Sequence, residues 1–303
     1  MSDNGKGGQR DLKCTIIVRA YGDPETTDKC LQSLGIVEVE GAHVILIDQE
    51  GAWSAWFEES YRRYEAEGRR RWRRSMTVVR TPENVGAVRA TNQGLQVAML
   101  DNSQFVLVLD NDVEIPDGDK TWLDRWLAHF DDENVAAVGA VTDRVSGAQN
   151  VQVVDRRYTR DWQSEGKQGV SGSIEVPWLI SFACMYRKDA LIQMPSPNVT
   201  MGDIMQKRSV HISHHAHLWD ERFSPGQWED IDVSIRLTAP WCADSTWKLV
   251  VAQDVYLHHK CHSAFEEIGG FNELLETNIR KGCEKWTPQL VANIGQAAVE
   301  VTR

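Results

Sequence analysis

The sequence predicts an α/β protein whose central sheet is mostly parallel and flanked by helices. Short β-branched runs such as CTIIVRA (Cys14–Ala20) and HVILIDQ (43–49) alternate with amphipathic segments along the first half of the chain. This alternation is typical of consecutive βαβ units, whose crossovers are right-handed. A third run, FVLVL at 105–109, is too short for a helix and fits a strand that is buried on both faces.

A helix is expected after each of the first two strands. The turn YGDPE ends the first strand, and the following helix is predicted to start at Thr26 or Thr27 and to close at Gly35. The second strand ends in Asp48, and an amphipathic pattern between Trp53 and Arg74, broken at Gly68, predicts a helix. Both connections fit parallel pairing of the strands that they join.

The segment RRRWRR at 69–74 is the most basic part of an acidic chain. Because charge runs usually face water, a solvated helix end is the simpler interpretation. The alternative is a binding surface for an anionic acceptor, on which Trp72 is available for stacking.

The segment 76–86 predicts a short strand and then a turn, and a helix follows from Gly86. Asn84, Gly86 and Arg89 would therefore lie at or near a helix N-terminus, where free N–H groups and a basic side chain suit an anion. The alternative is an ordinary Asn-x-Gly turn with no ligand.

Three acidic residues, Asp110, Asp112 and Glu114, directly follow the apolar run at 105–109. Ligands of open α/β sheets bind outside the carboxyl ends of the strands, so these carboxylates point to a site. Asp110 and Asp112 share one side of an extended chain, and Asn111 faces the other. Two oxygen ligands on one side suit Mg²⁺ or Mn²⁺. A solvated turn is the competing interpretation.

The second half of the chain is less regular. A strand is expected at 135–142, a loop or edge hairpin at 143–175, and an apolar strand leading into a helix at 176–191. The segment 193–217 has few periodic apolar positions. It contains a cluster of histidines, for which a polar loop is favoured over a zinc site. These histidines are His211, His214, His215 and His217.

A second acidic group, Glu229, Asp230 and Asp232, opens a predicted helix. Asp230 would lie in its first turn, where the helix dipole favours a carboxylate, although acids are common there without any function. Two short strands follow within 246–265 and carry the pair His258 and His259. The remainder, 266–303, is expected to be helical.

Composition excludes several classes of protein. The net charge of −11 argues against bulk attraction to nucleic acid or anionic lipid. Six cysteines without a CxxC pair indicate neither a disulfide framework nor a zinc ribbon. No apolar leader and no stretch near about 18 apolar residues is found, so we expect a cytoplasmic protein without a membrane span.

Seven segments in fixed order carry a family resemblance over about 15–265. They are TIIVRAYGDPE, VILIDQ, TPENVGAVRATNQGL, FVLVLDNDVEIP, VPWLISFACMYRKDAL, DERFSPGQWEDIDVSIRL and VYLHHKCHSAF. The chain resembles the inverting nucleotide-sugar transferases of glycosyltransferase family 2. The resemblance implies a GT-A fold with a Rossmann-like, mostly parallel sheet and a helical C-terminal extension.

The implied organisation has three parts. Residues 1–12 form a flexible tail, 13–265 form the GT-A domain, and 266–303 form the extension. Within the domain, the nucleotide-sugar half is expected at about 13–115 and the acceptor half at about 116–265.

The resemblance also implies how the donor is bound. Asp48 corresponds to the acid that reads the nucleotide base, Ala20 and Tyr21 to the loop around that base, and Arg89 to a basic residue near the donor. The expected donor-binding residues are Ala20, Tyr21, Asp48, Asn84, Gly86, Arg89, Asp110 and Asn111. Mn²⁺ or Mg²⁺ is the implied cofactor, and a UDP-sugar is the favoured nucleoside-diphosphate sugar.

The metal and the chemistry are assigned in the same way. Asp110 and Asp112 correspond to the family's DxD motif, and His258 to a histidine that completes the metal shell, with His259 the less favoured choice. Asp230 corresponds to the general base, with Glu229 beside it. A bound divalent cation would neutralise charge on the departing diphosphate, and a carboxylate on the opposite side would take the proton of the acceptor hydroxyl. One displacement inverts the anomeric configuration.

Several alternatives remain open at this stage. The acceptor is expected to be a hydroxyl of a glycan or small molecule, and hydroxymethylated bases of DNA are an alternative. A nucleotidyltransferase or a non-catalytic nucleotide-sugar binder is a further alternative. The chain departs from the family after Asp48, at QEGAWSAW, and in the histidine-rich insertion. We expect this insertion and residues 69–74 to form the acceptor site.

Overall fold

The computed structural model describes residues 13–34, 41–66, 76–145, 148–150, 172–206, 218–238, 247–260, 270–290 and 292. These residues build an eight-stranded sheet in the order β3-β2-β1-β4-β8-β6-β9-β7. The strands are β1 (Cys14–Ala20), β2 (Ala42–Gln49), β3 (Met76–Thr81), β4 (Phe105–Asp110), β6 (Val135–Val141), β7 (Ser173–Val176), β8 (Ala183–Arg187) and β9 (Lys248–Tyr256).

The sheet is mostly parallel, which confirms the predicted fold class. Strands β3, β2, β1 and β4 are parallel neighbours, and β6 pairs with β9 in parallel. β8 is antiparallel to both β4 and β6, and β7 is antiparallel to β9 at the edge. A separate two-stranded ribbon pairs β5 (Val113–Glu114) with β10 (His258–His259).

Side chains alternate between two apolar layers, one on each face of the sheet, because successive residues of a strand point to opposite faces. Ile17 and Val108 pack into one layer, and Ile16 and Leu109 into the other. The first layer is covered by α3 (Gly86–Ala98), α7 (Lys188–Gln193), α9 (Glu229–Thr238) and α11 (Phe271–Trp286). The second is covered by α1 (Pro24–Ser33), α2 (Ala52–Ala66) and α4 (Trp122–Ala128).

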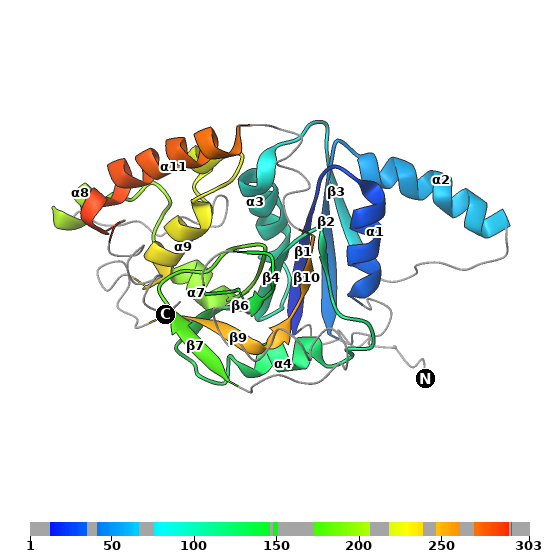
Figure 1. Cartoon of the computed structure of the whole chain (residues 1–303), viewed down its shortest axis with the longest axis horizontal. Coiled ribbons are helices and arrows are strands. Elements are labelled where there is room, and N and C mark those ends of the chain that lie inside the picture. Colours follow the sequence, from blue (N-terminus) through cyan, green and yellow to red (C-terminus); the bar gives the residue numbers. More distant parts are fainter. Residues whose placement is uncertain are drawn as a thin grey trace, which may run out of the picture.

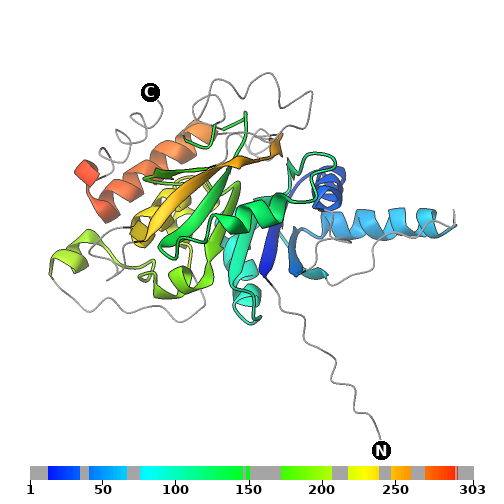
Figure 2. The same cartoon turned by 90° about the horizontal axis from the view of Figure 1, so that it is seen from below.

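The two ends of the fold differ in shape. Helix α2 extends away from the body on one side, and α11 lies beside α9 on the opposite side (Figure 1). The view turned by 90° shows the same separation of α2 from α11 (Figure 2). Two short helical elements, α8 (Met201–Met205) and η1 (Glu221–Phe223), complete the described fold. None of the helices in the described ranges is long and apolar enough to cross a bilayer.

Some local predictions need correction. Helix α1 starts at Pro24 with Asp23 as its N-cap, because the Asp23 carboxylate accepts a hydrogen bond from the amide of Glu25. The strand expected in 176–186 is interrupted, since β7 ends at Val176 and β8 begins only at Ala183. The basic segment 69–74 and the four clustered histidines lie outside the described residues.

Candidate active site

A buried ion pair joins the carboxyl ends of β1 and β4. The two strands run in parallel register, so Arg19 lies opposite Asp110, and the Arg19 Nη2–Asp110 Oδ1 distance is 2.5 Å. Arg19 also donates to the carbonyl of Ser181 at 2.8 Å and to Thr91 Oγ1 at 3.2 Å. Burial raises the pKa of Asp110, while the charge of Arg19 opposes this rise.

Helix α3 can supply Thr91 because it packs very closely on β1. A Cβ on Gly94 would lie 2.4 Å from the Cγ2 atom of Ile17, so only glycine permits this approach. Thr91 follows Ala90 on the buried side of α3 and is itself fully buried. The tight helix–strand contact therefore fixes one of the three partners of Arg19.

The short ribbon β5–β10 brings a histidine to the second carboxylate. His259 pairs with Val113 in the ribbon, and the amide of Lys260 donates to the carbonyl of Asp112 at 3.0 Å. His259 Nε2 consequently lies 3.2 Å from Asp112 Oδ1. Ligand atoms of Asp110, Asp112 and His259 all lie within 4.8 Å of one another.

The two neighbouring histidines differ in their distance from the carboxylates. His258 and His259 are neighbours on an extended chain, so their side chains point in opposite directions. His259 faces the carboxylates, whereas His258 is exposed and lies edge-on against the ring of Tyr256. The residue brought to Asp110 and Asp112 is therefore His259, and the predicted His258 is not part of this cluster.

The donor set of this cluster fits a divalent cation. Two carboxylates and one imidazole are typical ligands of Mn²⁺ and related ions. The His259 Nδ1 atom is buried and has no hydrogen-bond partner among the described residues, and its ring stacks on Phe182 with centroids 4.8 Å apart. Asp112 Oδ1 and His259 Nε2 already face each other from two different elements. The residues present are thus suited to hold a metal.

A second acidic group, Glu229 and Asp230, lies at the N-terminus of α9. Burial raises the pKa of Asp230 to about 6, although the amides of Ile231 and Ser181 hydrogen-bond to its carboxylate. Burial and the neighbouring Asp230 raise the pKa of Glu229 to about 8, and Glu229 Oε2 has no hydrogen-bond partner in the described part of the chain. Both carboxyl groups thus keep their protons to a higher pH than ordinary acids do, and the rise in pKa is larger for Glu229 than for Asp230.

The segment between β7 and β8 connects this acidic pair to the ion pair. The carbonyl of Phe182 accepts a hydrogen bond from the amide of Asp110 at 2.8 Å, and Leu179 donates to Ser234 Oγ of α9 at 3.2 Å. Ser181 offers its carbonyl to Arg19 and its amide to Asp230. The guanidinium charge of Arg19 acts on both Asp110 and Glu229. The structure thus brings the two predicted acidic groups to one edge of the sheet.

Asp48, the predicted neighbour of the nucleotide base, holds the start of α2 in place. Its two carboxylate oxygens accept the amides of Trp53 and Ser54 at 3.1 and 3.0 Å, and the residue is 1% exposed. These contacts cap the start of α2. The predicted contact of Asp48 with a nucleotide base stays a prediction, and both of its carboxylate oxygens already have partners in the protein.

The expected anion site at the start of α3 is likewise taken up by the protein. The amide of Gly86 lies 2.9 Å from Asn84 Oδ1 and 3.1 Å from Gln49 Oε1. Gly86 has φ of 79°, and a Cβ there would lie 2.6 Å from the Cα atom of Pro225. Gly86 is thus required by a turn and a close contact, and its N–H is not available to an anion.

The remaining donor candidates are arranged around the end of β1. Arg89 is half-exposed and pairs with Glu221 Oε2 at 3.2 Å, outside the carboxylate cluster. Asn111 donates its amide to the carbonyl of Tyr21 at 3.0 Å and to Thr27 Oγ1 at 2.8 Å. Asn111 therefore holds the loop after Ala20 against α1 and β4.

Sequence reasoning missed Arg19 and Ser181. A signal for Arg19 existed, since a lone arginine near the end of the apolar run CTIIVRA must find a partner if it is buried. The sequence gives no signal for Ser181, because its contacts with Arg19 and Asp230 are made by its backbone carbonyl and amide and depend on how the chain crosses the edge of the sheet.

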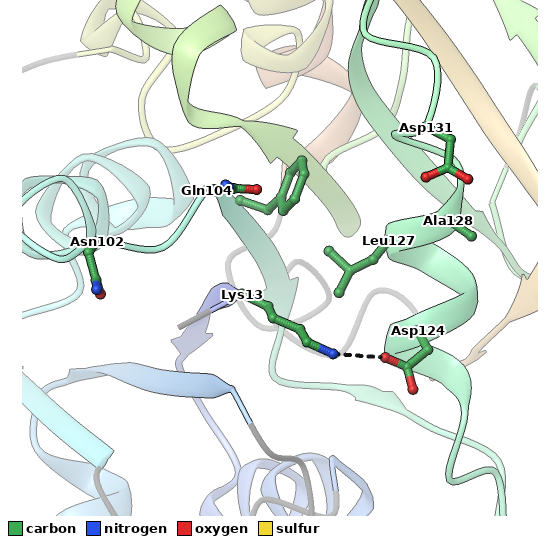
Figure 3. Close-up of a pocket in the computed structure, with 8 residues that line it drawn as sticks. Lys13, Asn102, Gln104, Asp124, Leu127, Ala128 and Asp131 are labelled. Carbon is green, nitrogen blue, oxygen red and sulfur yellow. Dashed lines mark ion pairs between the residues drawn. The ribbon is translucent and has the colours of Figure 1, made fainter. Parts of the chain in front are cut away.

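A separate cavity of about 500 Å³ lies at the other, amino-terminal edge of the sheet. Lys13, just before β1, and Phe105, at the start of β4, are among its lining residues. Lys13 forms an ion pair at 3.5 Å with Asp124, another residue that lines the cavity (Figure 3). Both side chains are largely exposed, and no residue of the carboxylate cluster lines this cavity.

Comparison with known proteins gives the following findings. The family model "Glycosyl transferase family 2" matches residues 15–194. A search of curated protein sequences finds no match. A mannosyltransferase from Pyrobaculum calidifontis, solved with GDP-Man and Mn²⁺, has 13% identity and a TM-score of 0.48, with 84% of this chain and 59% of that chain covered. S. aureus TarS 1-349, solved with UDP-GlcNAc, has 13% identity and a TM-score of 0.47, with 93% and 66% covered. The chain thus spans less than two thirds of these structures.

Proposed function

Since the chain belongs to glycosyl transferase family 2, we propose that this glycosyltransferase moves a sugar from a nucleoside-diphosphate sugar to a hydroxyl acceptor, with inversion at the anomeric carbon. One observation carries the proposal. The metal-suited cluster of Asp110, Asp112 and His259 shares an edge of the sheet with the acidic pair Glu229 and Asp230. Donor activation and proton removal need such groups on either side of one reaction centre.

Asp110, Asp112 and His259 would hold Mn²⁺ or Mg²⁺ with the donor diphosphate. When bound, the ion supplies positive charge that stabilises the departing diphosphate. Arg19 keeps Asp110 in place through its contact at 2.5 Å, and its buried positive charge favours the ionised carboxylate. The ring of His259 stacks on Phe182, which limits the movement of this imidazole.

Asp230 would act as the general base. The acceptor oxygen forms a bond to the anomeric carbon as the bond from that carbon to the diphosphate oxygen breaks. The acceptor proton passes to the Asp230 carboxylate, and the nucleoside diphosphate leaves. A pKa of about 6 makes Asp230 a stronger base than an ordinary aspartate while leaving it mainly ionised at neutral pH. Glu229, with a pKa of about 8, stays neutral and adds no second negative charge.

The nucleotide remains a prediction, with a UDP-sugar as the favoured donor. Tyr21, which directly follows β1, is partly exposed. We therefore propose that Tyr21 and Ala20 lie beside the nucleotide base. Asp48 and Asn111 would act indirectly, through the start of α2 and the loop at Tyr21. Arg89 would contact the donor only after release from Glu221.

No observation favours the alternative acceptors or activities. The basic segment 69–74, on which the DNA alternative depends, lies outside the described residues, and the chain carries a net charge of −11. Family membership argues against a nucleotidyltransferase or a non-catalytic binder.

The test is a donor panel in which UDP-, GDP- and dTDP-sugars are incubated with the protein, Mn²⁺ and pooled hydroxyl acceptors. We expect release of nucleoside diphosphate and a glycosylated product whose anomeric configuration, read by NMR, is opposite to that of the donor. Modified DNA in one arm tests the DNA alternative, and salt dependence would accompany such binding. Release of pyrophosphate, or retention of configuration, would refute the proposed reaction.

A further inference from the structure

The turn that precedes the acidic pair has an unfavourable backbone conformation. Gln227 and Trp228 have φ values of 75° and 80°, although neither is glycine. Such left-handed conformations are disfavoured for residues with a side chain and persist only where surrounding contacts impose them. Glu229 and Asp230 follow immediately, so whatever imposes this turn also sets their direction.

Asn278 of α11 donates the hydrogen bonds that hold this turn in its conformation. Its Nδ2 atom lies 3.1 Å from the carbonyl of Phe223, 2.8 Å from that of Gly226 and 3.0 Å from that of Gln227. Asn278 is fully buried, so water does not replace these contacts. One side chain thus fixes both ends of the segment 223–227.

Gly282, one helical turn further along α11, makes room for the indole of Trp228. A Cβ at position 282 would lie 2.4–2.6 Å from three atoms of the Trp228 ring, closer than real contacts allow. Trp228 is 5% exposed, and its ring also lies 5.4 Å from that of Phe223. The lack of a side chain at Gly282 therefore leaves the space that the indole of Trp228, the residue before Glu229, occupies.

Lys285 and Trp286, on the last turn of α11, anchor the first turn of α9. Lys285 Nζ lies 2.6 Å from Asp232 Oδ1 and 2.8 Å from Asp220 Oδ2. Trp286 Nε1 donates to Asp232 Oδ1 at 2.7 Å. Asp232 is only two residues after Asp230, and both partners from α11 are buried.

We propose that α11 is a positioning element for the general base, in which Asn278 and Gly282 hold the turn 223–228 so that Asp230 keeps its direction at the reaction centre. The α11 contacts described above go to residues of the segment 220–232, which leads into Asp230, so we expect α11 to act on proton removal and not on donor binding. This inference deepens the proposed function and rests on its assignment of Asp230. Helix α11 lies beyond the segment 15–194 that the family model matches.

Two variants of the 303-residue chain test the proposal, one by removing contacts and the other by adding a methyl group. Asn278→Ala removes the contacts to the turn, and Gly282→Ala displaces Trp228 while adding a better helix-forming residue to α11. Arg280→Ala, at an exposed position of the same helix, is the matched control. Measurements are kcat, donor KM, Mn²⁺-dependent donor affinity, and hydrogen–deuterium exchange of segments 223–232 and 105–115.

We expect kcat to fall by about 10- to 100-fold in both variants, since a misplaced catalytic group costs on this order. Donor KM and affinity should stay within threefold, and exchange should accelerate in 223–232 but not in 105–115. The Arg280→Ala control should match the parent protein. Loss of donor affinity in parallel with kcat, or unchanged kcat in Gly282→Ala, would overturn the proposal.

The exchange measurement separates this proposal from the proposed function. If the parent protein transfers no sugar, the function fails, and unchanged exchange of 223–232 in both variants would reject the positioning role independently. If transfer is confirmed and the variants keep kcat, only the role of α11 fails.

Discussion

The two ends of the β1–β4 pair each hold a buried cation beside a carboxylate, but the two ion pairs differ in their surroundings. At the amino end, Lys188 Nζ lies 2.6 Å from Asp101 Oδ1 and also donates to the carbonyl of Ala98. Asp101 also receives hydrogen bonds from Thr15 and Ser103. Partial burial would raise the pKa of Asp101, but these hydrogen bonds, led by that of Lys188, lower it to about 2.

At the carboxyl end, some polar atoms around the corresponding ion pair have no hydrogen-bond partner among the described residues. Arg19 contacts Asp110, yet the pKa of Asp110 and that of Glu229 are both raised. Arg19 Nε, Glu229 Oε2 and His259 Nδ1 are buried without hydrogen-bond partners among the described residues. Buried polar groups normally find partners, because an unsatisfied one costs about 1–3 kcal/mol. The amino end is thus satisfied within the protein, whereas the carboxyl end keeps buried polar atoms without partners, as the proposed function requires.

The largest expected effect concerns the base. Asp230→Asn should lower kcat by about 10²–10⁴-fold, because the amide cannot accept the acceptor proton. Donor affinity should stay within about threefold, since Asp230 is not in the metal cluster. Steady-state kinetics and donor titration with Mn²⁺ check this, with Asp112→Ala as the contrasting variant that loses donor affinity. Retention of kcat in Asp230→Asn would assign the base elsewhere.

The next effect is on stability at the opposite end. Lys188→Met leaves the Asp101 carboxylate without its cation, which should cost about 3 kcal/mol and lower Tm by roughly 6–12 °C. The kcat of the folded protein at 20 °C should remain within twofold, because the pair lies at the edge away from the reaction. Thermal unfolding followed by circular dichroism, with kinetics at 20 °C, tests both parts. A large loss of kcat without a change in Tm would contradict the assigned division of roles.

Much of this division could be predicted from the sequence. The apolar run at 105–109 followed by Asp110 and Asp112 gave the strand, its direction and the metal-suited carboxylates, because period and position are local properties. The acidic pair at Glu229 was recognised as a helix start for the same reason.

The remaining features depend on contacts between distant segments. The choice of His259 over His258 follows from the pairing of β10 with β5, which no local pattern specifies. Asp48 was expected to face a ligand, but α2 starts so soon after β2 that its amides take both carboxylate oxygens. Asn278 gave no signal, since its partners lie more than 50 residues earlier in the chain.

An effect of similar size concerns the pH dependence of stability. Burial gives Glu229 a pKa of about 8 against an ordinary 4.5, so the folded state retains a proton that the unfolded state releases between these values. Stability of the parent protein therefore decreases as pH rises through this window. Glu229→Gln removes this titration, which is worth about 3 kcal/mol over the range, so the Tm of the variant relative to the parent should increase by roughly 6–12 °C between pH 5 and pH 8.

Asp101→Asn should show the opposite sign, which makes it the control. The pKa of Asp101 is lowered to about 2, so its stabilising contribution is present above about pH 4 and is lost as pH falls through 2. The deficit in Tm of this variant should be constant from pH 5 to pH 8 and shrink below pH 4. Parallel slopes for the two variants would show that burial does not distinguish the two carboxylates.

The smallest expected effect decides between neighbouring histidines. At about five times its Kd, a ligand of the folded state adds about 1 kcal/mol, so Mn²⁺ with nucleoside diphosphate should raise Tm by roughly 2–4 °C. His259→Ala should lose this shift, because His259 Nε2 lies 3.2 Å from Asp112 Oδ1 within the cluster. His258→Ala should keep it, because the exposed His258 side chain faces Tyr256 instead. Differential scanning fluorimetry with and without EDTA measures the shift. The reverse pattern would identify His258 as the metal ligand. It would show that β10 rotates when the metal binds, so that the opposite face of this strand meets the carboxylates.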